Sequence, residues 1–442
     1  MAAVDSAQLD RIASQPRTLR KVVFASLIGT TIEWYDFFLY GTAAALVFNK
    51  LFFPQAEPLI GALLAFSTYA LGFLARPLGG VVFGHYGDRI GRKKLLMASL
   101  VLMGGATVAI GCLPTYAQVG MAAPILLVML RLLQGFAVGG EWGGAVLLVA
   151  EHGDAARRGF WSSWPQSGVA AGNLLAAGVL AVMTALQTEE QFLAWGWRIP
   201  FLLSAILIGI GWWVRTTVDE SPAFEAVRRE AKIHRAPAIE ALRTQPRALA
   251  IGAGLRMAEN ICYYVITAFS ITYVTEVVGL SRQLALNALL IASAVHFIVI
   301  PSFAALSDRI GRRPVYAIGA IGTGIWIFAF FRLLDTGASG AVVAAIVVGL
   351  VFHGAMYGPQ AAFLSEMFPT RIRYSGVSLA YQATSIVAGS LAPIIAIAIL
   401  RETDSAIGVA FYVAAAAALT LAATLLAPET RATSLADIDT RR

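Results

Sequence analysis

Charged side chains inside long apolar segments are the residues of this sequence whose types and spacing could do chemistry. Within residues 22–48, Glu33, Asp36 and Tyr40 fall on one face of a helix. Two carboxyl groups one turn apart in a medium of low dielectric cannot both ionise at low cost. The spacing therefore predicts that Glu33 or Asp36 binds and releases a proton near neutral pH. The alternative is a salt bridge or a helix-capping pair that only fixes packing.

Residues 122–150 contribute two more charges, Arg131 and Glu141. They are ten residues apart and not on one line of the helix, so we do not pair them with each other. Arg131 shares its face with Gln134 and Trp142 and is a candidate partner for a carboxylate of residues 22–48. Such a pair would keep the carboxylate charged until protonation or a substrate breaks it. Glu141 is a further candidate for proton coupling.

Residues 248–277 carry a comparable set, in which Arg256, Glu259 and Tyr263 share a face. An arginine can bind a carboxylate ligand through two parallel hydrogen bonds, and Asn260 flanks this face. The alternative is an internal Arg256–Glu259 pair that neutralises itself. Further candidate ligand-binding side chains are Tyr40, Trp142, Gln166, Asn173 and Gln382.

Three other polar residues in apolar segments are interpreted mainly as structural. Arg76 precedes Pro77, which should kink its helix. The arginine lies either in the transport pathway or in a fixed interhelical pair, and the structural role is favoured. His296 and His353 are isolated on apolar helices and are predicted to pack in the neutral form.

The elements that must position these residues are membrane-spanning helices. Of the 442 residues, 58% are hydrophobic and only 13% are charged, and the mean hydropathy is +0.72. A soluble protein has about 25% charged residues, and disorder requires few hydrophobic ones, so both classes are excluded. Twelve runs are long enough to span a bilayer, and none shows the alternation of a membrane β-strand. They are residues 22–48, 59–83, 95–113, 122–150, 159–185, 198–214, 248–277, 284–306, 314–334, 339–367, 374–400 and 406–427.

A polar segment, residues 215–247, divides the chain into two halves. We predict an all-α integral membrane fold of twelve transmembrane helices in two pseudo-symmetric six-helix bundles, at residues 22–214 and 248–427. Residues 1–21 and 428–442 are predicted tails. Duplicated halves of this kind are typical of transporters, with the substrate site between the halves.

The distribution of Lys and Arg predicts the orientation. With both termini in the cytoplasm, the inner segments hold 25 of the 33 Lys and Arg residues and the outer loops hold five. This asymmetry satisfies the rule that cytoplasmic loops are positive. Residues 1–21 contain no apolar core of a cleavable signal peptide.

An internal repeat gives a second set of candidate residues, at the cytoplasmic ends of the spans. Residues 84–93 recur as residues 304–313, and a weaker repeat relates residues 151–158 to 366–373. The aspartate of each copy can lie at the N-terminus of a neighbouring helix, where the helix dipole stabilises its negative charge. The arginine of each copy can form an ion pair with a glutamate. These contacts would close the cytoplasmic side, with purely topogenic charges as the alternative. The candidate gate residues are Asp88, Arg89, Arg92 and Glu151 in the first half, and Asp308, Arg312 and Glu366 in the second. Ala304 replaces the leading glycine, so we expect a looser helix contact in the second copy.

Several function classes are excluded by absent patterns. The sequence has no phosphate-binding loop, no nucleophile arrangement and no metal-ligand cluster, so we expect neither an enzyme nor a metal or cofactor. The two cysteines lie in apolar segments and give no disulfide framework. The basic residues form no single patch, so a nucleic acid is not an expected partner.

Specific sequence strings resemble the major facilitator superfamily. They are the D-R-x-G-R-[RK] loop in both halves, Arg131-Leu-Leu-Gln134-Gly135, and Pro428-Glu429-Thr430. Longer strings resemble its metabolite:proton symporter family, at residues 32–41, 72–80, 134–144 and 196–201. Residues 44–49 and 123–128 are most similar to the shikimate permeases of that family. Relatives in the family carry α-ketoglutarate, citrate, proline or betaine.

The resemblance implies a function. We expect an inner-membrane, proton-coupled importer of a small organic acid, working as a monomer by alternating access, with the proton as coupling ion. It also implies that Arg131 assists proton transfer. A zwitterion such as proline or betaine is the alternative substrate, and a membrane-bound sensor or a channel is a less favoured alternative function.

Overall fold

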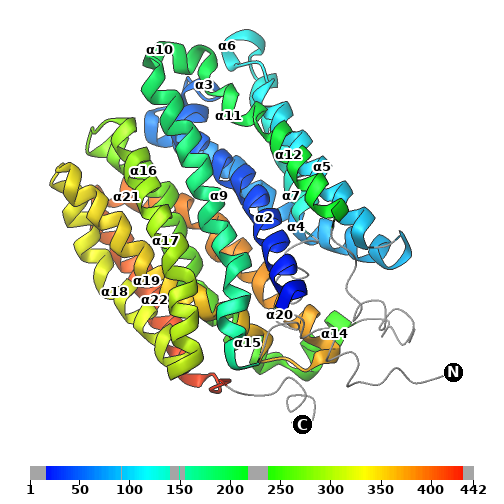
Figure 1. Ribbon diagram of the computed structural model, residues 1–442. Coiled ribbons are helices and arrows are strands. Elements are labelled where there is room, and N and C mark those ends of the chain that lie inside the picture. The colour runs from blue at the N-terminus through cyan, green and yellow to red at the C-terminus, as the bar shows by residue number, and fades with distance from the viewer. Residues whose placement is uncertain (1–15, 91, 140–148, 150–154, 218–236, 432–442) are drawn as a thin grey trace.

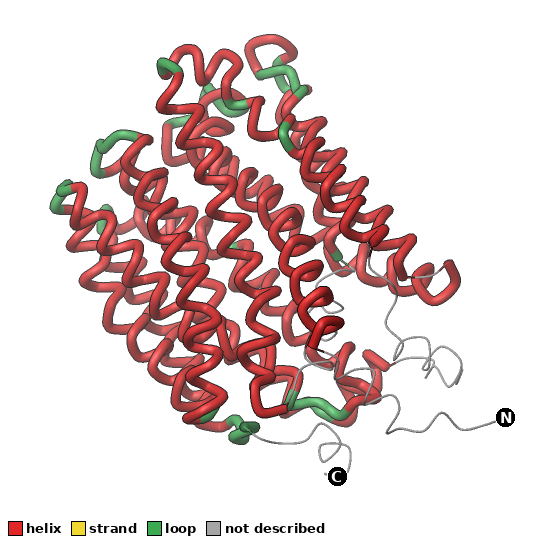
Figure 2. The backbone as a smooth tube through the Cα atoms, in the orientation of Figure 1, coloured by secondary structure: helices red, strands yellow, loops and turns green. Residues whose placement is uncertain are grey.

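The computed structural model describes all residues except 1–15, 91, 140–148, 150–154, 218–236 and 432–442, and for residues 83–90 and 92–96 it describes little beyond the backbone. Within this part of the chain every regular element is a helix, and no strand is present (Figure 2). Polar backbone groups are therefore satisfied within each segment, as a lipid environment requires.

The first half contains six spans, several of them built from more than one helical piece. The first span joins α2 (Pro16–Ala43), the π-helix η1 (Ala44–Phe48) and α3 (Asn49–Leu51). It is followed by α4 (Pro58–Ile90), α5 (Arg92–Gly111), the short α6 (Tyr116–Val119), α7 (Ala122–Val138), η2 (Ala155–Arg157) and α9 (Arg158–Leu186). The sixth span consists of α10 (Glu189–Gln191), η3 (Phe192–Gly196), α11 (Arg198–Leu202) and α12 (Ser204–Thr217).

The second half repeats this arrangement. After the short α14 (Pro237–Thr244), its first span joins α15 (Pro246–Tyr264), the π-helix η4 (Val265–Phe269), α16 (Ser270–Thr272) and η5 (Tyr273–Val277). The next three spans are α17 (Arg282–Ile310), α18 (Arg312–Asp335) and α19 (Ser339–Ser365). The last two are α20 (Thr370–Thr384) with η6 (Ser385–Ser390) and α21 (Ala392–Thr403), and then α22 (Ala406–Leu426).

Where the predicted spans can be compared with these helices, they differ at two places, and the end of the predicted span 122–150 lies outside the described residues. The prediction of residues 198–214 starts too late, because the helical segment begins at Glu189. Thr188 and Gln191 form a reciprocal capping box there, which starts a helix in a stretch too polar to be read as a span. The second difference concerns length and hydropathy. Among the described residues, nine helices are both long and apolar enough to cross a membrane, and α5 and α7 contain shorter apolar helices. The segment Pro246–Val277 is not among the nine. That segment carries the buried charges Arg256 and Glu259.

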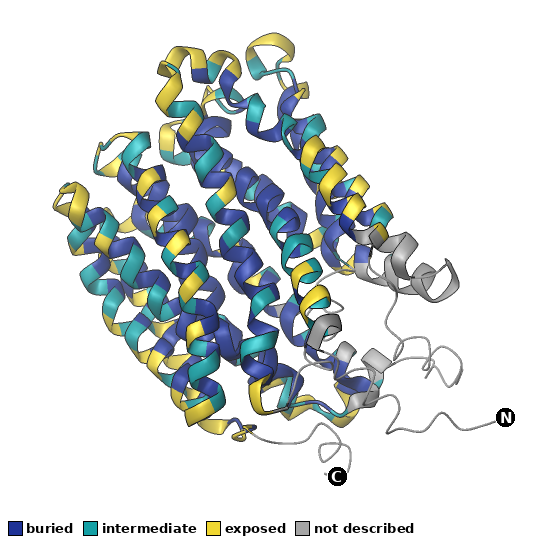
Figure 3. Cartoon of the chain, in the orientation of Figure 1, coloured by how far each residue is buried: buried dark blue, intermediate teal, exposed yellow. Residues whose placement is uncertain are grey.

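The degree of burial of each residue depends on which side of its helix faces the inside of the bundle (Figure 3). Buried residues line the interior, whereas large apolar side chains such as Trp213, Ile325 and Leu186 are more than 60% exposed on the outside. An apolar exterior on this scale suits a bilayer and not water. The start of α2 and the end of α22 lie at the same end of the bundle (Figure 1).

Close helix crossings place the polar residues inside. A Cβ atom at Gly135 of α7 would overlap the carbonyl oxygen of Gly72 in α4, so these backbones touch. This crossing brings Arg76 and Arg131 into one pocket. At the boundary between the halves, α9 and α17 pack side by side through the centre of the molecule (Figure 1).

Candidate functional site

The first-half site surrounds Asp36, which is buried in α2. Its Oδ1 accepts a hydrogen bond of 2.6 Å from Ser204 Oγ of α12, and Thr107 of α5 is a second partner. Gln134 donates to Thr107 over 2.7 Å and accepts from Arg131 Nη1 over 3.1 Å. The carboxylate and the guanidinium are therefore linked through two polar side chains and line the same pocket.

Two arginines of this site lie on aromatic rings. The Arg131 guanidinium carbon is 4.4 Å from the ring centre of Tyr40 and 4.5 Å from that of Tyr69. The Arg76 carbon is 4.2 Å from the ring centre of Phe73, and Arg76 Nε has no hydrogen-bond partner in the described part of the chain. Aromatic faces stabilise buried cations without neutralising them. The pocket thus holds two arginines for one aspartate.

Glu33 lies in different surroundings from Asp36, although both are buried in α2. Its charge acts on Tyr381 of α20, in the second half of the chain. Asp36 faces partners from α5 and α12 in its own half. The two carboxylates are thus placed towards different parts of the molecule, and the proton-carrying role of either one stays a prediction.

The second-half site centres on Arg256 of α15. Its Nη1 donates to Gln360 Oε1 over 2.7 Å and lies 3.4 Å from Glu259 Oε2. Nη2 donates to Ser385 Oγ over 3.3 Å, and the guanidinium carbon is 3.4 Å from the ring centre of Tyr381. The self-neutralising Arg256–Glu259 pair, stated above as the alternative, is therefore formed in this conformation.

Two histidines extend this site. His353 of α19 lies with Nε2 3.3 Å from Glu259 Oε1, and its Nδ1 is 2.9 Å from Nε2 of His296 in α17. Gln360 Nε2 donates to the other Glu259 oxygen over 3.1 Å. The histidines are fully buried, as the sequence indicates, but they are not isolated. They contact each other and a carboxylate.

Polar and aromatic contacts cross the boundary between the halves beside this site. Asn173 of α9 donates from Nδ2 to Tyr263 Oη over 3.3 Å, and Gln166 Nε2 donates to the Tyr357 carbonyl over 3.4 Å. The Phe38 ring packs 5.5 Å from that of Tyr263. Three of the predicted ligand-binding residues, Gln166, Asn173 and Tyr263, therefore meet across the boundary.

The other predicted ligand-binding side chains bond within their own halves or lie outside the described residues. Tyr40 Oη is 2.6 Å from Thr68 Oγ1, and Asn260 Nδ2 donates to Glu259 Oε2 over 3.1 Å. Gln382 is partly exposed. Glu141 and Trp142 belong to the segment that is not described.

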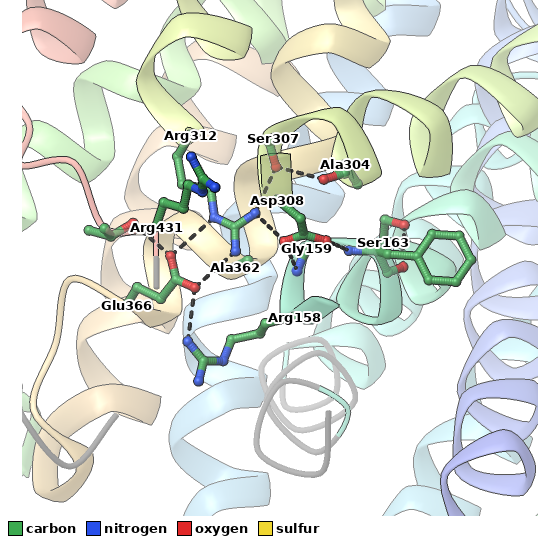
Figure 4. A network of polar contacts seen from close by, with 12 residues as sticks. Arg158, Gly159, Ser163, Ala304, Ser307, Asp308, Arg312, Ala362, Glu366 and Arg431 are labelled. Atoms are coloured by element: carbon green, nitrogen blue, oxygen red, sulfur yellow. Dashed lines mark hydrogen bonds and ion pairs between the residues drawn. The ribbon is translucent and has the colours of Figure 1, made fainter. Parts of the chain in front are cut away.

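One end of the molecule holds a buried charge network (Figure 4). Arg312 Nη1 is 2.6 Å from Asp308 Oδ1, and Nη2 is 3.1 Å from Glu366 Oε1. Glu366 also pairs with Arg158 of α9 over 3.0 Å, which joins the two halves. Arg158 is a contact that the predicted gate set lacks. It ends the first copy of the weaker repeat, whereas Glu366 begins the second copy.

Asp308 caps the start of α9. Its two carboxylate oxygens accept hydrogen bonds from the backbone nitrogens of Gly159 and Phe160 over 2.9 and 2.8 Å. A carboxylate is stabilised there by the unpaired N–H groups and the positive helix end. The equivalent side chains of the first copy, Asp88, Arg89, Arg92 and Glu151, lie outside the described side chains.

Glu429 fastens the chain after α22 to the same network. Its oxygens accept backbone hydrogen bonds from Arg312 and Arg313 over 2.9 and 3.1 Å. Thr430 donates to Glu366 Oε2 over 2.6 Å. Partial burial opposes ionisation of Glu429, but these N–H donors outweigh it and hold the pKa of Glu429 below its usual value.

The opposite end also joins the halves, with weaker contacts. Glu189 lies 3.2 Å from Lys50 Nζ and 3.1 Å from Arg282 Nη2, and its side chain is 62% exposed. Thr184 donates to Gln283 Oε1 over 2.6 Å. The halves are therefore in contact at both ends around the central residues.

Comparisons with known proteins agree with this architecture. The sugar (and other) transporter family matches residues 21–248 and 228–441. The chain belongs to this family. The predicted fold class is thereby confirmed, and so is the prediction of a transporter and not an enzyme.

The relatives of this transporter are named for different substrates. It is 44% identical to the shikimate transporter of Escherichia coli K12 over 86% of its own chain and 88% of the relative. It is 43% identical to the E. coli inner membrane metabolite transport protein YhjE over 94% of its own chain and 95% of the relative. It is 35% identical to a Salmonella typhimurium proline/betaine transporter over 89% of its own chain and 80% of the relative.

A solved structure has the same fold. The major facilitator proton:xylose symporter XylE, bound to 6-bromo-6-deoxy-D-glucose, superposes with a TM-score of 0.74 at 18% identity. The match covers 96% of the transporter and 99% of XylE. At this identity the likeness establishes the fold alone.

Sequence reasoning missed two parts of the site. Arg76 shares the pocket of Asp36 and Arg131, and an arginine next to a proline in an apolar span was the only sequence signal of this arrangement. His296 and His353 are 57 residues apart, so no local spacing could indicate their contact.

Proposed function

We propose that this transporter carries a small organic acid together with protons into the cell by alternating access of its two halves. The supporting observation is that each half buries a carboxylate and an arginine beside the boundary, around Asp36 and Arg131 and around Glu259 and Arg256. Buried charges in a membrane protein cost at least about 2.5 kcal/mol each and mark substrate or ion pathways. Carboxylates suit the proton, and arginines suit an anionic substrate.

In this proposal the two ends of the boundary open in turn. The network of Asp308, Arg312, Glu366 and Arg158 holds one end closed, and the Glu189 contacts hold the other. Both termini face the cytoplasm. Support comes from the excess of Lys and Arg in the inner segments and from the start of α2 and the end of α22, which share one end of the bundle (Figure 1).

A zwitterion is the second candidate substrate. Several relatives are proline/betaine or glycine betaine/proline transporters, and aromatic faces can bind a quaternary ammonium group. Tyr264 is ringed by Phe37, Tyr69 and Phe73 at 6.1 to 6.3 Å, which offers such faces at the boundary.

Uptake into proteoliposomes tests the proposal. Labelled shikimate, proline and glycine betaine are offered separately, with and without an inward proton gradient. We expect accumulation of the carboxylic acid above equilibrium only with the gradient. Preferential accumulation of betaine or proline would select the zwitterion, and gradient-independent equilibration of every compound would contradict proton coupling.

A further inference from the structure

The two histidines and Glu259 form a continuous hydrogen-bonded chain, here called the histidine chain. It runs from His296 in α17 through His353 in α19 to Glu259 in α15, with contacts of 2.9 and 3.3 Å. Both histidines are at most 1% exposed, and Glu259 is 5% exposed. Three separate helices thus supply three titratable groups in direct contact.

The chain has a direction because of the chemistry of imidazole. A neutral imidazole donates from one nitrogen and accepts at the other. If Glu259 is ionised, His353 Nε2 must donate to it, so His353 Nδ1 must accept from His296 Nε2. The remaining nitrogen, His296 Nδ1, then carries a lone pair, and it is buried without a partner in the described part of the chain. This nitrogen can therefore accept a proton at one end of the histidine chain.

We propose that the histidine chain conducts a proton from His296 Nδ1 to Glu259, and that its arrival frees Arg256 to bind the carboxylate of the substrate. The proposal rests on the proposed function and adds a second proton site to it. When a proton binds His296 Nδ1, the Nε2 proton of His296 passes to His353 Nδ1. The Nε2 proton of His353 passes to Glu259. One proton has entered, Glu259 is neutral, and both histidines are neutral again in the opposite tautomer.

Protonation of Glu259 changes the state of Arg256. The ion pair of 3.4 Å loses its negative partner, whereas the bonds of Arg256 to Gln360 and Ser385 involve neutral groups and remain. A buried guanidinium without an anion is unfavourable, so the affinity for an incoming carboxylate rises. By reciprocity, the bound carboxylate raises the affinity of the chain for its proton by the same factor.

The titratable and charged groups around the histidine chain come from several helices, and the charge of Glu33 in α2 acts on Tyr381 among them. From α15 the chain is faced by Arg256, Cys262, Tyr263 and Tyr264, from α18 by Tyr316, from α19 by Tyr357 and from α20 by Tyr381. The helix α9 contributes the neutral Asn173 and Gln166. Arg256 is thus the permanent cation beside Glu259.

The chain ends next to the boundary between the halves. The ring centres of His296 and Tyr263 are 5.9 Å apart, and Tyr263 is the residue that bonds Asn173 across the boundary. A proton can therefore reach His296 when the halves separate, and the histidine chain leads it to Glu259 beside the substrate-binding arginine.

Infrared spectroscopy after a rapid drop in pH tests the relay without any substrate. The purified protein in detergent is followed at the carboxylic-acid C=O stretch, and the band of protonated Glu259 is identified by its loss in Glu259→Gln. His296→Gln and His353→Gln retain hydrogen-bonding groups but cannot relay a proton. We expect the band to appear at least about 100-fold more slowly in both than in the parent. His234→Gln, in the segment between the halves, is the matched control and should behave as the parent.

Substrate binding at two pH values tests the second step. With labelled shikimate as the probe, the parent should bind about tenfold more weakly at alkaline than at acidic pH, whereas Glu259→Gln should bind equally at both. If no compound is transported in proteoliposomes but the infrared band behaves as expected, the proposed function fails and the relay stands. Parent-like rates in both histidine variants, or a band that Glu259→Gln does not remove, would overturn the relay.

Discussion

The two halves bury their charges in different ways. In the first half, Arg131 and Arg76 rest on aromatic rings, and Asp36 reaches Arg131 only through Thr107 and Gln134. In the second half, Arg256 contacts Glu259 directly and is also bonded to Gln360 and Ser385. Among the described residues that line the first site, two arginines accompany one aspartate, whereas Arg256 in the second site is directly paired with Glu259. In the proposed mechanism, the site of Arg131 can bind an anion directly. Arg256 can bind one only after a proton has neutralised Glu259.

Removal of the central arginines should show the largest difference between the halves. Arg256→Gln leaves Glu259 buried without its cation and should cost about 3–5 kcal/mol of stability. Arg131→Gln removes mainly contacts with aromatic rings and should cost about 1–2 kcal/mol. Thermal unfolding in detergent measures both. The double variant Arg256→Gln with Glu259→Gln should recover most of the loss, and equal losses in the two single variants would contradict the comparison.

Neutralisation of the α2 carboxylates should separate coupling from exchange. Asp36→Asn should abolish gradient-driven accumulation but leave substrate exchange across the membrane, because exchange needs no net release of a proton. Glu33→Gln should act similarly but more weakly. Accumulation and counterflow of labelled shikimate in proteoliposomes measure the two properties. Full accumulation in both variants would remove these carboxylates from the mechanism.

Loss of the buried network should bias the transporter towards opening at that end. Asp308→Asn removes a charge that caps α9 and pairs with Arg312. The cap joins the two halves, and the proposed function requires it to break when this end opens. A loss of about 1.4 kcal/mol from one state changes the ratio of states about tenfold. Labelling of a cysteine introduced at Ser163, which is buried in this structure, should become faster in a Cys112→Ser background. Arg309→Gln, at the exposed neighbouring position, is the control, and equal labelling in both would contradict a gating role.

The smallest expected effect concerns Glu429. Because its pKa is lowered in the folded protein, its contribution is complete above the usual Glu pKa of about 4.3 and is lost as the pH falls through the folded value. The size should stay below about 1 kcal/mol, because the residue is partly solvated. Glu429→Gln should flatten the acid side of the curve of unfolding temperature against pH. An unchanged acid slope would mean that other carboxylates determine it.

The sequence predicted the helices well because hydropathy is a local property. The spans from residue 248 onward begin and end within a few residues of the observed helices, even where π-helical turns such as Val265–Phe269 interrupt them. The start at Glu189 was missed because Glu189 and Glu190 lower the hydropathy of the segment, whereas the capping box of Thr188 and Gln191 determines the structure there.

The candidate site was predictable only in part, because side-chain partners depend on packing between helices. The internal pair of Arg256 and Glu259 follows from their spacing of three residues. The contacts of His353 with His296 and of Arg158 with Glu366 join residues 57 and 208 positions apart, and no periodicity encodes them. Arg76 was interpreted as structural because its aromatic surroundings come from other turns and helices.

Proton movement during substrate entry tests the central claim most directly. A concentrated shikimate solution is added to proteoliposomes in an unbuffered medium, and the external pH is recorded with the uptake of label. If the transporter couples an organic acid to protons, the medium turns alkaline as the label enters, and Asp36→Asn shows neither net uptake nor alkalinisation. Entry of labelled shikimate at an unchanged external pH would contradict the account.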